Sequence, residues 1–529
     1  MEAREALAGE SAEGQTEVAV RGKNVLLIVA DQWRGDALRV AGNRNVRTPN
    51  IDRLCSEGVT FRRHYCQTIP CGPARVSLLT GMYQMNHRAV QNTVPLDDRH
   101  RNLSDMLRDA GYDPVMVGYT TTTPDPRSTS ATDRRFFSLG DMMRGWRPIA
   151  QFDPDMAEYF AWVRSKGFKL PDNPRDVWQP SSGPVKRGAT SEPSRIPAEL
   201  SDTSYFTERA LSHLEGCGDK PWFMHLGYWR PHPPYAAPAP YHNRHDPADM
   251  AAPRRAATAE EEARQHPLLD FYIRTTPRAM FFQGASGLTA EMTEDEVRQT
   301  RATYYGLMEE VDDNIGRVLR WLDETGQRDN TLIIFTSDHA EQMGDHYLFG
   351  KVGYFSESYH VPMVVCDPDP QARASRGRVV DAFSEGIDCV PTIMDWLGRQ
   401  VERTVDGRSL LPWCRGETPS GWRREAHYEY DFRDVYYSAP EAALGLHMDR
   451  CSLAAIEDSR YKYVHFAAMP ALFFDLEDDP FQFRNLADDA AYAPLVRDYA
   501  QRMLSWRLDH AERTLTGYRA SPEGLIVRR

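Results

Sequence analysis

Residues 24–31 read NVLLIVAD, a continuous apolar run that ends in the carboxylate of Asp31. A run of this length, rich in branched aliphatic residues, predicts a strand that is buried on both faces. Similar runs occur at residues 114–118, 222–227, 331–336 and 361–365. Helical spacing of apolar residues lies between them, most clearly over residues 296–325. Strands that alternate with helices in this way predict an α/β fold, with a large, mostly parallel sheet flanked by helices.

The chain has 529 residues, above the roughly 250–300 at which a single core usually divides. We expect a flexible tail at residues 1–22, followed by a catalytic α/β domain at residues 23–405. From residue 406 the pattern changes to short alternating segments, as at residues 460–466, which predict antiparallel strands. Residues 406–529 are therefore expected to form a smaller α+β subdomain that contains an antiparallel sheet and ends in a helix.

The composition narrows the class of protein. Lys and Arg number 63 and Asp and Glu 76, a net charge of −13, which disfavours a nucleic-acid or anionic membrane partner. No run approaches the roughly 18 apolar residues of a membrane helix, and the first 22 residues lack the apolar centre of a secretory signal. The eight cysteines include no Cys-x-x-Cys pair, which disfavours a disulfide scaffold or a zinc ribbon. We expect a cytoplasmic enzyme.

The pentapeptide CGPAR, at residues 71–75, precedes the apolar run VSLLTG. A reactive Cys71 at a helix N-terminus is physically reasonable, because free backbone N–H groups and the helix dipole favour an anion there. The alternative is a buried structural cysteine beside a turn proline. The pentapeptide by itself leaves both interpretations open.

Two of the apolar runs, far apart in the chain, end in metal-binding residue types. The first ends at Asp31, and the run at residues 331–336 is followed by Ser337, Asp338 and His339. Ligands gather outside the carboxyl ends of strands in open α/β sheets, so we expect both clusters to face one crevice. Two carboxylates and an imidazole there need a cation, and they suit Mn²⁺, Ca²⁺ or Mg²⁺, with Zn²⁺ or Fe²⁺ as alternatives. Taken singly, each cluster could also be a helix cap.

These motifs occur in the order found in the sulfatase family of the alkaline phosphatase superfamily, which the sequence resembles. Its Cys-x-Pro-x-Arg signature directs oxidation of the cysteine to formylglycine. Further segments are similar to bacterial phosphonate monoester hydrolases and phosphodiesterases within that family. They read DQWR at residues 31–34, NHRAVQNTVP at 86–95, GYTTT at 118–122, GYWRPHPP at 227–234 and YEYDFRDVYY at 428–437.

The resemblance implies a role for each matching residue. It gives the ligands of one divalent metal ion, most simply Mn²⁺, as Asp31, Cys71, Asp338 and His339. Arg75 is expected to hold the nucleophile that Cys71 becomes. His232 and Lys351 are expected to act as leaving-group acid and electrostatic clamp. The expected donors to substrate oxygens are Asn92, Tyr119 and Thr121. A formylglycine-generating enzyme is the partner during maturation, and a homo-oligomer, a tetramer, is expected.

Two positions differ from ordinary arylsulfatases and bear on the substrate. Many of those enzymes have a second Asp directly after the first, where this chain has Gln32, and commonly an Asn where this chain has His339. A less negative metal site suits phosphonate monoesters and phosphodiesters better than sulfate esters and favours Mn²⁺. The sequence therefore predicts a promiscuous phosphonate monoester hydrolase and phosphodiesterase. The alternatives are an arylsulfatase in the strict sense and a non-catalytic metal-binding relative with unmodified Cys71.

Overall fold

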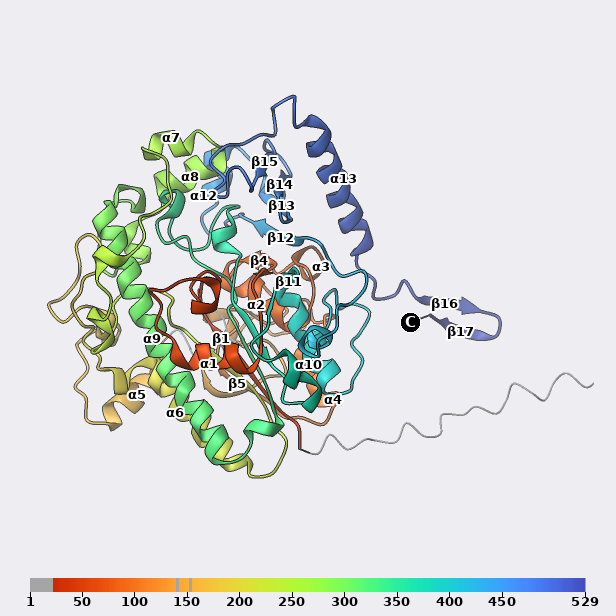
Figure 1. The fold of residues 1–529 in the computed structure, drawn as a ribbon, viewed down its shortest axis with the longest axis horizontal. Coiled ribbons are helices and arrows are strands. Elements are labelled where there is room, and N and C mark those ends of the chain that lie inside the picture. The colour runs from red at the N-terminus through yellow and green to blue at the C-terminus, as the bar shows by residue number, and fades with distance from the viewer. Residues whose placement is uncertain (1–21, 139–141, 152–154, 529) are drawn as a thin grey trace, which may run out of the picture.

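The computed structural model describes residues 22–138, 142–151 and 155–528, and Figure 1 shows their arrangement. The predicted tail at residues 1–22 lies, except for residue 22, outside the described residues. The thirteen α-helices of the described part are α1 Pro49–Glu57, α2 Cys71–Thr80, α3 Gln84–His87, α4 Leu103–Asp109, α5 Ala157–Ser165, α6 Asp202–Cys217, α7 Ala259–Ala263, α8 Pro267–Thr275, α9 Glu294–Glu324, α10 Cys389–Trp396, α11 Leu411–Cys414, α12 Ala439–Leu444 and α13 Ala493–Asp509.

The main sheet has eight strands in the order β10-β2-β9-β8-β1-β7-β5-β6. They are β1 Asn24–Ala30, β2 Val59–Phe61, β5 Pro114–Gly118, β6 Arg147–Gln151, β7 Phe223–Tyr228, β8 Thr331–Thr336, β9 Met363–Cys366 and β10 Val379–Val380. Every pairing is parallel except the two made by β9, which runs antiparallel to both neighbours. The predicted α/β class with a mostly parallel sheet is confirmed.

Strand β1 lies in the middle of this sheet and is buried along its whole length, as its sequence predicts. Its alternate side chains enter two separate cores because successive side chains of a strand point to opposite faces. Leu26, Ile28 and Ala30 pack with residues from α1, α5, α6 and α9. Val25, Leu27 and Val29 pack with residues from α2, α4 and α10. The helices thus cover both faces of the sheet (Figure 1).

A second sheet of five strands has the order β15-β14-β13-β12-β4. Its strands are β4 Thr68–Ile69, β12 Ala426–Asp431, β13 Ser452–Glu457, β14 Tyr461–Phe466 and β15 Leu472–Asp475. The four later strands are antiparallel, which confirms the predicted antiparallel sheet of the C-terminal part. The short β4 pairs in parallel with β12 and ends two residues before Cys71, so the C-terminal sheet adjoins the start of α2.

The remaining strands form two short pairs. β3 His64–Tyr65 pairs with β11 Ser384–Glu385, and β16 Tyr518–Ser521 pairs with β17 Gly524–Val527. The β16–β17 hairpin follows α13 and projects away from the rest of the molecule (Figure 1). Among the described residues, no helix has both the length and the apolar character needed to cross a membrane.

Candidate functional site

Four neighbouring parallel strands of the main sheet bring most of the predicted site residues to one edge. β8, β1, β7 and β5 lie side by side, with Val29 opposite Thr336 and Ala30 opposite Tyr228. The segments that follow these strands contain His339, Asp31, His232 and Tyr119, respectively. The carboxyl edge is where an open α/β sheet places its ligands, and both clusters expected from the sequence, Asp31 and Asp338 with His339, lie there.

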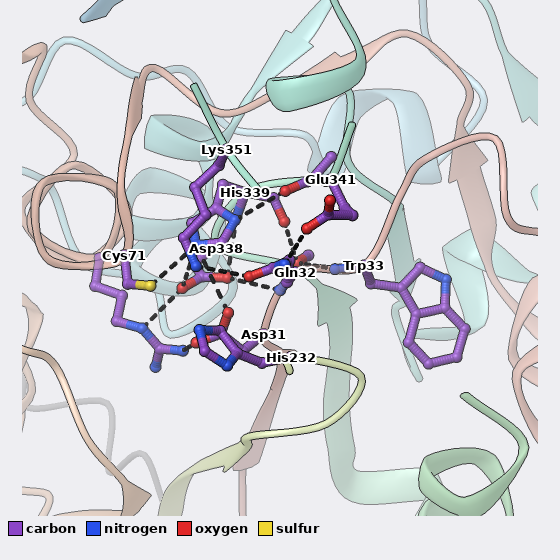
Figure 2. A network of polar contacts seen from close by, with 12 residues as sticks. Asp31, Gln32, Trp33, Cys71, His232, Asp338, His339, Glu341 and Lys351 are labelled. Carbon is purple, nitrogen blue, oxygen red and sulfur yellow. Dashed lines mark hydrogen bonds and ion pairs between the residues drawn. The ribbon is translucent and has the colours of Figure 1, made fainter. Parts of the chain in front are cut away.

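The centre of the site is a buried cluster of four possible metal ligands, Asp31, Cys71, Asp338 and His339, whose donor atoms all lie within 4.8 Å of one another. His339 Nε2 is 3.1 Å from Cys71 Sγ and 3.6 Å from a carboxylate oxygen of each Asp. The Nδ1–H of the same ring donates to the Ala340 carbonyl at 3.0 Å. That hydrogen bond leaves the Nε2 lone pair facing the centre of the cluster (Figure 2).

These residues fit a divalent cation. Asp31 is fully buried, yet its Oδ1 has no hydrogen-bond partner among the described residues. An unpaired carboxylate oxygen is costly to bury, and a cation at the centre of the cluster would compensate it. Burial lowers the pKa of His339 well below its usual value, so the ring is neutral, as a metal ligand must be.

Arg75 links the two carboxylates of the cluster. Its Nε donates to Asp338 Oδ2 at 2.9 Å and its Nη2 to Asp31 Oδ2 at 3.0 Å. Its Nη1 donates to the Tyr119 carbonyl at 2.8 Å, and the guanidinium lies over the Tyr119 ring. The Tyr119 hydroxyl also donates to Asp31. Arg75 is fully buried, and it fixes the positions of two predicted metal ligands at once.

Cys71 is the first residue of α2 and is nearly inaccessible to solvent. Burial and the nearby Asp31 raise the pKa of its thiol to about 12, against the smaller opposing effect of Lys351. The protein groups therefore hold it as a neutral thiol, in contrast to the low pKa of cysteines that act as nucleophiles themselves. These surroundings argue that Cys71 does not act as a simple cysteine nucleophile.

Gln32 connects this cluster to Lys351. Its backbone has a positive φ of 71°, which turns the chain sharply after β1, and its N–H donates to Asp338 Oδ1 at 3.2 Å. Its side-chain amide donates to Glu341 and accepts from Lys351 Nζ at 2.6 Å (Figure 2). Burial alone would lower the pKa of Lys351, but Cys71, Asp31, Asp338 and Glu341 together raise it. The lysine is thus held as a cation beside the cluster.

His232 lies in the turn after β7, half-buried and close to Asp31 (Figure 2). Its Nδ1–H donates to the Pro233 carbonyl at 2.7 Å, so Nε2 is the atom available to a substrate. Burial, with a further contribution from Lys351, lowers the pKa of His232 to about 3. The ring is therefore neutral at pH 7 in the free protein.

Asn92 and Thr121 lie against the start of α2. The Asn92 side-chain oxygen accepts from the Gly72 N–H at 2.7 Å, and within the described part of the chain the Asn92 NH₂ group has no hydrogen-bond partner. The Thr121 hydroxyl is buried and is likewise unsatisfied there. Residue 72 must be glycine, because a Cβ would lie 2.8 Å from the Thr121 carbonyl oxygen. Both side chains thus have donor groups available close to Cys71.

Glu341 was not predicted from the sequence. It accepts hydrogen bonds from the backbone N–H groups of Met343 and Gly350, at 3.0 and 2.5 Å, and from the Gln32 amide. It therefore fixes both the loop that carries Lys351 and the Gln32 side chain that Lys351 contacts. The available signal was its position three residues after Asp338, in the same segment that follows β8.

The buried ion pairs of Arg75 lead to a stability prediction. Arg75→Ala leaves two buried carboxylates without their cation, so in chelator-treated protein the free energy of unfolding should fall by about 3 kcal/mol or more. The matched control is Arg62→Ala, because Arg62 pairs with Asp381 where both side chains are about half exposed (52% and 54%). That change should cost less than about 1 kcal/mol. Urea unfolding of both variants measures the difference, and equal losses would contradict the role of Arg75.

The chain is similar to several known proteins along most of its length. The sulfatase family model matches residues 23–399, and the C-terminal model of N-sulphoglucosamine sulphohydrolase matches residues 344–509. The multifunctional alkaline phosphatase superfamily protein PehA of Trinickia caryophylli is 58% identical, over 96% of this chain and 99% of its own length. The phosphonate monoester hydrolase of Agrobacterium radiobacter has 40% identity and a TM-score of 0.92, with 96% and 100% of the two chains covered. That of Silicibacter pomeroyi has 36% identity and a TM-score of 0.90, with 96% and 99% covered.

Proposed function

The chain belongs to the sulfatase family of the alkaline phosphatase superfamily, as a phosphonate monoester hydrolase-like hydrolase, and from this we propose that it cleaves phosphonate monoesters and phosphodiesters through a formylglycine made from Cys71. The observation that carries the proposal is the buried cluster of Asp31, Cys71, Asp338 and His339, with neutral Gln32 directly after the first ligand. We propose these four as the ligands of one divalent cation, with Mn²⁺ preferred and Ca²⁺, Zn²⁺, Fe²⁺ or Mg²⁺ as alternatives.

Maturation replaces the CH₂–SH group of Cys71 by an aldehyde. This change removes the sulfur and oxidises Cβ, so it needs an external oxidant and the formylglycine-generating enzyme that we propose as partner. Cys71 is buried, with under a tenth of its surface exposed, which argues that the enzyme acts before the chain folds completely. The raised pKa of the thiol supports a mechanism that does not rely on a thiolate.

The proposed reaction has two steps. The aldehyde is hydrated, and one of its hydroxyls attacks phosphorus in line while the ester oxygen leaves with a proton. The second hydroxyl then loses its proton, the bond between carbon and the oxygen attached to phosphorus breaks, and the aldehyde re-forms as phosphonate or phosphate departs. A bound divalent cation would make the attacking hydroxyl more acidic. Because the second step breaks a bond at carbon, the substituent on phosphorus matters little, which accounts for promiscuity that extends to sulfate esters.

We propose that the surrounding residues orient the substrate and balance its negative charge. Lys351 carries a proton at neutral pH and lies beside the cluster, so it suits the role of electrostatic clamp on the phosphoryl oxygens. His232 presents Nε2 on the other side of the site, and it becomes a leaving-group acid only when the anionic ester raises its pKa. We assign Asn92, Tyr119 and Thr121 to substrate oxygens. For Tyr119 the hydroxyl that would donate is bound to Asp31 in the free protein.

The proposed substrate preference is directly testable. Gln32 in place of a carboxylate leaves the site more positive, which favours the larger negative charge on phosphoryl oxygens in the transition state. We expect kcat/KM for an aryl phosphonate monoester and for an aryl phosphodiester to exceed that for the matching aryl sulfate by at least about tenfold, or about 1.4 kcal/mol. Steady-state kinetics on the three esters with one common leaving group provides the measurement. A clear preference for sulfate would identify a strict arylsulfatase instead.

We also propose a homo-oligomer, the tetramer that the family resemblance implies. The support is the projecting β16–β17 hairpin, whose apolar side chains are largely exposed in a single chain, including Leu525 at 66% and Ile526 at 49%. Apolar surface of this kind marks protein contacts. A chain shortened to residue 514 should therefore elute as a smaller species than the full chain in gel filtration with light scattering. An unchanged mass would contradict a role of the hairpin in assembly.

A cytoplasmic location is supported by the cysteines. All eight are free, and most of them are buried, as is usual in a reducing compartment.

A further inference from the structure

A cavity of about 460 Å³ lies beside the site, between residues 91–95 and 430–436. Its volume is in the range of small-molecule sites. The two segments meet directly, because the Val435 N–H donates to the Gln91 side chain at 3.3 Å. Of the residues that line this cavity, the proposed reaction at Cys71 uses only Asn92.

The cavity adjoins the proposed nucleophile through two residues of its lining. Pro70, which precedes Cys71 in the chain, and Asn92, which accepts from the Gly72 N–H, both line it. A phosphorus atom held at Cys71 would therefore have one of its ester substituents next to this opening. The cavity is thus placed to receive a part of the substrate that does not react.

The charge of the lining is negative. It includes Asp431 and Asp434 but no Lys or Arg. Asp431 is balanced by Arg433, at 2.7 Å, with Arg88 at 3.6 Å. Asp434 differs, because no basic side chain pairs with it within the part of the chain that the structure describes. Its Oδ1 accepts from the backbone N–H groups of Tyr436 and Tyr437, at 3.0 and 3.1 Å, which fixes the carboxylate at the cavity.

Aromatic rings complete the lining. Tyr430 is buried, and its hydroxyl is held by the Tyr272 hydroxyl at 2.6 Å, so it presents an ordered aromatic wall. Tyr436 also lines the cavity, is 84% exposed, and packs edge-to-face on Tyr437 with 4.5 Å between ring centroids. An aromatic ring that is exposed to this extent adds little to the packing of the protein. It is therefore available to contact a ligand. Ring faces next to an unbalanced carboxylate are a setting that binds organic cations.

We propose that this cavity is a subsite for a substituted ammonium group carried on one ester substituent of the substrate. The inference rests on the proposed function, since it assigns the part of the ester that the reaction leaves unchanged. Asp434 supplies the charge, and Tyr430 and Tyr436 supply the ring faces. A neutral substituent of equal size gains only the apolar contact.

The test compares two aryl phosphodiesters that share a 4-nitrophenyl leaving group. The second substituent is choline in one and 3,3-dimethylbutanol, its uncharged isostere, in the other. We expect kcat/KM for the choline ester to be higher by about tenfold, the size of one cation–π contact combined with one partly exposed charge pair. Equal values for two esters that are both hydrolysed would overturn the inference and leave the proposed function standing. Hydrolysis of neither would overturn the proposed function and this inference with it.

Three variants test the residues. Asp434→Asn removes the charge but keeps an oxygen that can accept the two backbone N–H groups, and it should bring the ratio of the two kcat/KM values close to one. Tyr436→Leu should also lower the ratio, whereas Tyr436→Phe, which keeps the ring, should preserve it. Asp329→Asn is the control for the overall negative charge, because Asp329 is exposed and precedes β8 at the opposite edge of the sheet. If Asp329→Asn lowers the ratio as much as Asp434→Asn does, the assignment of this cavity as an ammonium subsite is wrong.

Discussion

The Cys71→Ala variant is expected to lose at least about four orders of magnitude in kcat/KM for every ester that the protein cleaves. In the proposed mechanism residue 71 forms the bond to phosphorus in the first step and breaks its own carbon–oxygen bond in the second, and Ala cannot be converted to an aldehyde. Removing a nucleophile leaves only the catalysis that binding and charge stabilisation provide. The fold should survive, because a thiol replaced by hydrogen at the first position of α2 leaves only a small cavity. Kinetics with an aryl phosphonate monoester, beside circular dichroism of the variant, measures both.

The matched control is Cys217→Ser. Cys217 is the last residue of α6 and is half-buried. Its thiol donates a hydrogen bond to the His213 carbonyl in the same helix. This variant should keep full activity, which would show that loss of a cysteine alone is harmless. Substantial turnover by Cys71→Ala, once contamination is excluded, would mean that another group attacks phosphorus.

The second large effect is expected for Asp338→Asn, which should lower metal content and kcat/KM together, the latter by at least about a thousandfold. Asp338 is buried and holds the site together through three hydrogen bonds, from Arg75, the Gln32 N–H and the His339 N–H. A neutral amide can accept some of these, but it removes one of the two negative charges that face the cation. The metal content of the purified protein, measured by inductively coupled plasma mass spectrometry, should fall in parallel with activity.

Asp367→Asn is the control for this variant. Asp367 also follows a strand, β9, and is buried with the Trp396 indole and Arg415 as its partners, both at 3.2 Å. Because β9 runs antiparallel to β8, its carboxyl end lies at the opposite edge of the sheet, away from the site. Asp367→Asn should therefore keep its metal. Normal metal content and full turnover in Asp338→Asn would show that the ligand set is wrong.

Much of the fold was predictable because its signals are local. The apolar runs at residues 114–118 and 331–336 coincide with β5 and β8, and the periodic segment at 296–325 is α9 within two residues at each end. The direction of β9 was not predictable. An apolar segment looks the same in sequence whether its strand is parallel or antiparallel to its neighbours. The direction is set by how the chain connects one strand to the next.

The site was predictable in its residue types but less so in its contacts. Asp31 and Asp338 meet because parallel strands end at one edge, which is a rule of topology. The contacts of Arg75 depend on where three distant segments pack. The sequence led us to expect that Arg75 holds the nucleophile; in the structure its guanidinium also bonds to Asp31 and Asp338. Glu341 was missed for the same reason, since its importance comes from Gln32 and the Lys351 loop rather than from its neighbours in sequence.

The conversion of Cys71 to formylglycine is the central claim, and peptide mass spectrometry tests it most directly. Protein co-expressed with a formylglycine-generating enzyme should yield a peptide spanning residue 71 with the mass of an aldehyde in place of the CH₂–SH group, and this peptide should react with a hydrazine reagent. Its fraction should rise in proportion to specific activity across preparations. Fully active protein in which residue 71 carries only an intact thiol would contradict the mechanism.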